Sequence, residues 1–209
     1  MEQSTFLQTS KSYLRLGVLL ILTLFAGKFV VRDVLPYFGF DKETFGVYWN
    51  FKWILIGHIS GGLLALLIGP FQFWKKLRDK YPAIHRLTGR VYLIMTLIAA
   101  ICSTYLAWSS SIQLNFAWAF ALQVSAIAWA TTGLMAYISV RSGRITQHKE
   151  WMVRSYILTF SFAIFRWLVD IPLVINLMEN SGERKPTMAW FSWVVPLLIA
   201  EIIFSLKKK

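Results

Sequence analysis

Long apolar runs alternate with short basic segments along this chain of 209 residues. A helix needs about 18 or more apolar residues to cross the roughly 30 Å hydrocarbon core of a bilayer. Six runs meet that length: residues 14–31, 53–74, 91–108, 116–140, 151–174 and 188–206. The pattern therefore predicts a single all-α membrane domain over residues 1–209, built as a bundle of about six transmembrane helices.

The charges are few and lie between these runs. Charged residues make up 15% of the chain, hydrophobic residues make up 56%, and the net charge is +12. Lys and Arg gather between the second and third runs, between the fourth and fifth, and at the C-terminus, which is typical of cytoplasmic loops. We expect a multi-pass protein of the plasma membrane with both termini cytoplasmic, whose basic inner loops meet anionic lipid headgroups. This distribution argues against a nucleic-acid partner.

Two stretches resemble each other and suggest an internal repeat. His85, Arg90 and Tyr92 stand at the start of the third run, and His148 and Arg154 occupy corresponding places, with a tyrosine two residues further on, at the start of the fifth. Each set follows an apolar run and a basic loop. This spacing predicts two helical hairpins, runs two–three and four–five, related by pseudo-symmetry.

Ionisable residues within the apolar runs are costly in a bilayer and mark candidate sites. Arg166 and Asp170 are four residues apart, so they share one helix face and are predicted to form an ion pair. Both lie in the outer half of their run, as do Lys28 and His58 in theirs. These four residues are candidates for a ligand or proton site open to the exterior, although Lys28 at the end of its run also suits a side chain that reaches the surface.

The three histidines are candidate ligands of a cofactor. His85 and His148 are predicted at matched depth near the inner boundary, where neutral imidazoles could hold a haem or another metal. His58 lies near the opposite surface, beside the small residues Gly57 and Gly61. Those glycines favour close helix packing, and they also leave room for a flat ligand such as a haem, a quinone or a lipid tail.

Several strings of this sequence resemble a family of predicted bacterial membrane proteins known as domain of unknown function 2306. They are His58 with the glycine pair that follows it, then the strings at 69–73, 85–92 and 148–155, with Arg166 at the place of an intramembrane arginine. The resemblance covers roughly residues 50–170. It implies a small polytopic membrane protein and brings no established activity.

Three functions stay open on the sequence alone. The first is binding of a haem, metal or quinone-like ligand through His58, His85 and His148. The second is transport of a small solute or proton through Lys28, His58, Arg166 and Asp170. The third is a non-catalytic assembly or lipid-binding factor. Whether the protein is an enzyme, and its oligomeric state, are left open.

Overall fold

The computed structural model describes residue 17 and residues 20–207, and the regular structure in that part of the chain is entirely helical. Five segments there are long and apolar enough to cross a membrane. They contain α3 (Lys52–Phe73), α5 (Pro82–Ser109), α6 (Phe116–Arg141), α7 (Ile145–Val169) and α9 (Ser181–Leu206). This confirms the all-α membrane bundle. The predicted first run, residues 14–31, lies partly outside the described residues; its later part is a helix over residues 20–29.

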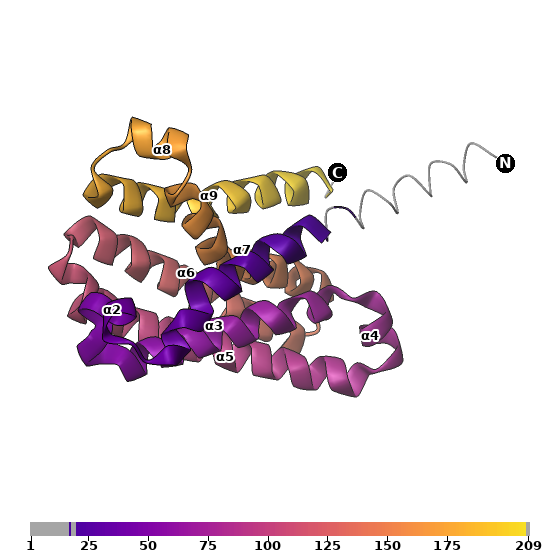
Figure 1. Ribbon diagram of the computed structural model, residues 1–209. Coiled ribbons are helices and arrows are strands. Elements are labelled where there is room, and N and C mark those ends of the chain that lie inside the picture. The colour runs from indigo at the N-terminus through magenta and orange to yellow at the C-terminus, as the bar shows by residue number, and fades with distance from the viewer. Residues whose placement is uncertain (1–16, 18–19, 208–209) are drawn as a thin grey trace.

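The long helices run antiparallel, and neighbours in sequence pack side by side. α3 packs on α5, α5 on α6, and α6 on α7, while α9 covers α7 and α6; α3 and α7 touch only sparsely. Figure 1 shows the short α4 (Lys75–Lys80) and the C-terminus at one end of the bundle, and α2 (Lys42–Phe45) and α8 (Pro172–Leu177) at the other. We call these the inner and outer ends. The basic segments therefore share one end, as predicted.

Small residues bring α3 and α5 together in the middle of the bundle. A Cβ atom at Gly61 would lie 2.8 Å from the carbonyl oxygen of Met95 and 3.1 Å from Cβ of Ala99, so only glycine fits there. Ala65, Ala99 and Ala136 are fully buried in the same core. Close packing of small residues is the usual way in which helices associate in lipid, where burial of apolar surface supplies little driving force.

The segment between the first helix and α3 is a compact cap instead of an open loop. It consists of η1 (Val30–Val34), η2 (Leu35–Gly39), α2 and η3 (Gly46–Phe51). Phe45 is only 1% exposed at its centre, with the ring of Tyr37 at 5.3 Å and that of Trp49 at 5.7 Å. The hydroxyl of Tyr48 lies 3.0 Å from Oγ of Ser111 and ties the cap to the α5–α6 connection. The cap covers part of the outer end of the bundle.

α7 ends earlier than the apolar run that predicted it. The run extends to residue 174, but the helix stops at Val169, with Asp170 as its C-terminal cap and Ile171 extended at φ −67° and ψ 126°. Pro172 explains this end, because the residue before a proline is disfavoured in the helical conformation. Asp170 is therefore placed at the outer surface and not within the span.

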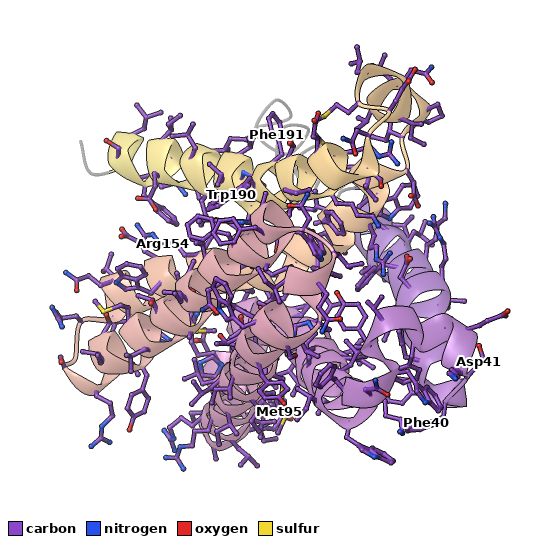
Figure 2. All side chains as sticks on the ribbon, turned by 90° about the vertical axis from the view of Figure 1, so that its left-hand side faces the viewer. Phe40, Asp41, Met95, Arg154, Trp190 and Phe191 are labelled. Carbon is purple, nitrogen blue, oxygen red and sulfur yellow. The ribbon has the colours of Figure 1, made fainter. Side chains whose placement is uncertain are left out.

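α9 is held to α7 by an ion pair at the inner end. Nε of Arg154 lies 2.5 Å from Oε1 of Glu201, and a second guanidinium nitrogen lies 2.9 Å from Oε2. Such a two-pronged pair fixes orientation as well as distance. Figure 2 labels Arg154 beside α9, where Trp190 turns toward α6 and Phe191 points away from the bundle. The sequence pattern places Arg154 in the predicted repeat and gives it no partner.

Candidate functional site: an interhelical cavity at the outer end

A cavity of about 260 Å³ lies in the outer half of the bundle. It is bounded by α3, α5, α6 and α7, by the cap above them, and by the start of α9. The sparse contact between α3 and α7 leaves the space open on that side, and Phe29 of the first helix lines it. Its walls are mostly apolar and carry a small number of polar groups, the usual make-up of a small-molecule site.

His58 is the histidine that lines this cavity. Its Nδ1 lies 2.9 Å from the backbone carbonyl oxygen of Ala99 on α5. A carbonyl oxygen only accepts hydrogen bonds, so Nδ1 carries the proton and donates. In the neutral ring Nε2 is then an acceptor, and it makes no hydrogen bond within the described part of the chain. The backbone thus fixes the tautomer of His58 and leaves one ring nitrogen available to a ligand.

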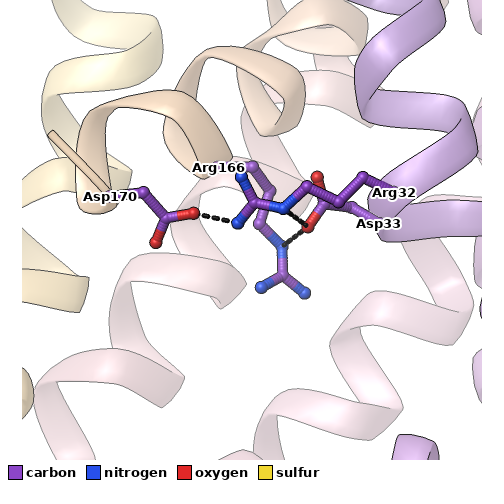
Figure 3. A network of polar contacts seen from close by, with 4 residues as sticks. All are labelled: Arg32, Asp33, Arg166 and Asp170. Carbon is purple, nitrogen blue, oxygen red and sulfur yellow. Dashed lines mark hydrogen bonds and ion pairs between the residues drawn. The ribbon is translucent and has the colours of Figure 1, made fainter.

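Four charged residues form a network at the outer end, which we call the rim (Figure 3). Arg32 donates a hydrogen bond to Asp170 and lies 3.8 Å from Asp33; Nε of Arg166 lies 3.8 Å from the same oxygen of Asp33. The rim therefore joins η1 to the end of α7. The predicted pairing of Arg166 with Asp170 is therefore wrong. Arg166 pairs with Asp33 and Asp170 pairs with Arg32, both of η1.

Within the rim, Arg166 and Asp33 face the cavity. The side chain of Asp33 is 11% exposed and that of Arg166 is 34% exposed, whereas Arg32 and Asp170 are about half exposed. The carboxylates of Asp170 and Asp33 raise the pKa of Arg32 above its ordinary value. Arg166 and Asp33 thus belong to the cavity wall, whereas Arg32 and Asp170 lie at the protein surface.

Two lysines near the rim have different surroundings. Lys185, the fifth residue of α9, lines the cavity. Lys28 is exposed, and its ammonium group lies 4.0 Å from the centroid of the Trp167 ring, a cation–π contact outside the cavity. Of the predicted outer cluster, His58 and Arg166 therefore meet at the cavity, while Asp170 and Lys28 lie around it.

A hydrogen-bonded group of buried side chains forms the floor. Nε1 of Trp129 donates to Oγ1 of Thr159 at 2.9 Å, and both residues line the cavity. Thr159 donates to the backbone oxygen of Ser155, so the hydroxyl of Tyr92, at 2.9 Å from Oγ1 of Thr159, is the donor in that contact. Oγ of Ser155 lies 2.9 Å from the oxygen of the same Tyr92 hydroxyl. The floor is satisfied internally and joins α5, α6 and α7.

His85 and His148 lie at the inner end and do not line the cavity. Nδ1 of His148 donates to the backbone oxygen of Ala136 at 2.9 Å, whereas Nδ1 of His85 is buried without a hydrogen-bond partner. His148, Arg78 and Arg86 are within electrostatic reach of the His85 ring. No group of three or more His, Cys, Asp or Glu side chains suited to a metal occurs in the described residues. Ligation by this pair stays a prediction.

Sequence reasoning missed Asp33, Lys185 and Thr159 as parts of the site. The available signal was the acid and base content of the two outer segments, 32–50 and 179–187, next to runs that carry Arg166 and His58. The sequence does not show that these segments fold back over the bundle.

The helices and this cavity define a polytopic membrane protein with a ligand-sized space between its helices near one surface. The chain belongs to the family described as predicted membrane protein, domain of unknown function 2306, whose family model matches residues 55–204. The match confirms the resemblance and extends it beyond residue 170 through most of α9. Comparisons with curated proteins and with solved structures found no match.

Proposed function

We propose that the protein binds one small amphipathic molecule of quinone-like shape in the interhelical cavity. The observation that carries this proposal is His58, which lines an otherwise largely apolar space and keeps Nε2 free for a ligand. Aromatic rings of Trp129, Phe162 and Phe165 stand around the same space. A flat ring system would pack on these walls, and one polar group would face the imidazole.

The tautomer of His58 favours one form of such a ligand. Because Nδ1 donates to Ala99, neutral His58 accepts a hydrogen bond at Nε2. The complementary group is a hydroxyl, as on a quinol or a phenol, and not a bare carbonyl. A haem is supported less well, because His58 is the sole one of the three histidines on this cavity and a bis-histidine site would need a second.

The proposal also includes a placement in the membrane. The basic α4 and the C-terminus share the inner end, so we place that end, and both termini, in the cytoplasm and the bundle in the plasma membrane. Lys75, Lys76 and Lys80 would then meet anionic lipid headgroups. The cavity would open near the exterior surface.

The test uses two histidines that make the same bond in different places. Nδ1 of His58 and Nδ1 of His148 each donate to a backbone carbonyl at 2.9 Å, but only His58 lines the cavity. In the asparagine variant of each, the amide nitrogen can keep that bond while the acceptor Nε2 is lost. Binding of a naphthol, a neutral hydroxyl-bearing ring, is measured on the full chain in nanodiscs of zwitterionic lipid by its fluorescence.

We expect saturable naphthol binding by the native chain, weakened about tenfold by His58→Asn, which corresponds to the loss of one hydrogen bond. His148→Asn should bind as the native chain does. Absence of saturable binding, or equal loss in both variants, would contradict the proposed site.

A further inference from the structure

The cavity carries more positive than negative charge at its outer end. Arg166 and Lys185 both line it, and Asp33 is the acidic residue among its lining residues. Arg32 and Asp170, the surface half of the rim, add one charge of each sign. Three cations therefore meet two carboxylates, and one positive charge at the cavity mouth has no counterpart within this group.

The existing partners of Arg166 leave its hydrogen-bonding capacity unused. Its Nε is buried and donates no hydrogen bond, and its ion pair with Asp33 spans 3.8 Å. Asp33 is shared, because Arg32 lies 3.8 Å from the same carboxylate oxygen. Lys185 has no ion pair within the described part of the chain. Buried donors without acceptors are costly, and guanidinium groups bind carboxylates with particular strength.

Arg166 and His58 are close enough for one small molecule to reach both. Both residues are near the ring of Phe162. The centroid of that ring is 6.5 Å from the centroid of the His58 ring and 5.9 Å from Cζ of Arg166. A hydroxyl at one end of a bicyclic ring system could meet Nε2 of His58 while an acidic group at the other end meets the arginine.

We propose that the ligand of this cavity is a monoanionic hydroxyaromatic carboxylate, whose carboxylate is held by Arg166 and Lys185 and whose hydroxyl faces His58. This inference rests on the proposed function and narrows it from amphipathic rings in general to acidic ones. Arg166 and Lys185 set the specificity for charge. Asp33 keeps Arg166 in place and limits the excess to a single positive charge.

The experiment compares two ligands that differ only in the acidic group. One is a hydroxynaphthoate with its hydroxyl and carboxylate at opposite ends of the ring system, and the other is the naphthol that lacks the carboxylate. Both are titrated into the full chain in nanodiscs of zwitterionic lipid, at a pH where the carboxylate is ionised. The variants are Lys185→Gln and, as a matched control, Lys28→Gln, since Lys28 is also an outer lysine but lies outside the cavity.

We expect the native chain to bind the hydroxynaphthoate about tenfold more tightly than the naphthol. Lys185→Gln should weaken hydroxynaphthoate binding about fivefold and reduce the preference for hydroxynaphthoate over naphthol, whereas Lys28→Gln should change neither affinity. Within the described residues Lys185 has no ion pair to break, so the variant is expected to fold; size-exclusion chromatography verifies this.

Two outcomes separate this inference from the proposed function. Equal affinity for both ligands, or an equal effect of both lysine variants, overturns the assignment of an acidic ligand while the cavity remains a binding site. Failure of both ligands to bind the folded native chain overturns the cavity as a site for hydroxyl-bearing rings, and the inference with it.

Discussion

The pairing of charges at the rim can be tested by removing charges one and two at a time. The structure joins Arg166 to Asp33 and Arg32 to Asp170, whereas the helical spacing of four residues joins Arg166 to Asp170. Neutral variants of similar shape are available in Arg166→Gln, Asp33→Asn and Asp170→Asn. The quantity of interest is the coupling free energy, the difference between the effect of a double variant and the sum of its single variants.

The magnitudes follow from distance and exposure. Two unit charges about 4 Å apart attract by about 4 kcal/mol at an effective dielectric constant of 20. Asp33 is 11% exposed and Arg166 is 34% exposed, so solvent removes part of this attraction, and we expect a coupling of about 1–2 kcal/mol. Arg32 and Asp170 are about half exposed, and their coupling should be about 0–1 kcal/mol.

The assay is unfolding of the purified chain by sodium dodecyl sulfate from mild detergent micelles, followed by tryptophan fluorescence. We expect the double variant of Arg166 and Asp33 to be more stable than the sum of the two single effects predicts, by about 1–2 kcal/mol. The double variant of Arg166 and Asp170 serves as the control, and its effects should add within about 0.5 kcal/mol. A larger coupling in the control than in the Arg166–Asp33 pair would refute the non-local pairing and restore the helical one.

Two further predictions concern the core and the orientation. Gly69→Ala places a Cβ 3.1 Å from Cζ of the Tyr156 ring and closer still to its edge, so in the same unfolding assay it should cost about 1–3 kcal/mol. Gly62→Ala on the same helix meets its nearest neighbour at 3.9 Å and should be neutral or mildly stabilising; equal effects would contradict the close approach. In a chain whose native cysteine is replaced, a cysteine at exposed Glu179 should react with an impermeant maleimide on intact cells, and one at exposed Ser142 only after permeabilisation. The reverse labelling would overturn the cytoplasmic placement of both termini.

The spans were predictable because each depends only on local composition. The run at 53–74 agrees with α3 to within a residue at each end, and the glycines within it were correctly expected to lie against a neighbouring helix. The end of α7 was not predicted by hydropathy, since Ile171 and Val174 are as apolar as the helix before them. Pro172 carried the missing signal, and it outweighs hydropathy because its ring excludes the helical conformation for the residue before it.

The partners in the ion pairs could not be predicted from the sequence, for a different reason. Arg154 and Glu201 are 47 residues apart, and Arg32 and Asp170 are 138 residues apart. Opposite charges at matched depth indicate that a pair is feasible, but the choice of partner depends on which helices are neighbours. Asp170 was the partner of Arg166 that helical spacing alone favours. That prediction fails because α7 ends at Val169 and the cap supplies Asp33 as the partner of Arg166.

The distribution of packing along the bundle bears on the choice between binding and transport. The outer half is hollow, but below Thr159 and Trp129 the core closes around Tyr92, which is fully buried and hydrogen-bonded on both sides. Ala65 and Ala136 are fully buried in the same inner layer. A solute in the cavity meets a satisfied polar floor and a close-packed layer beneath it, and passage would require breaking several hydrogen bonds in a low-dielectric interior. The free ring nitrogen of His58, the excess positive charge at the outer end and the closed floor therefore support the proposed binding function over transport.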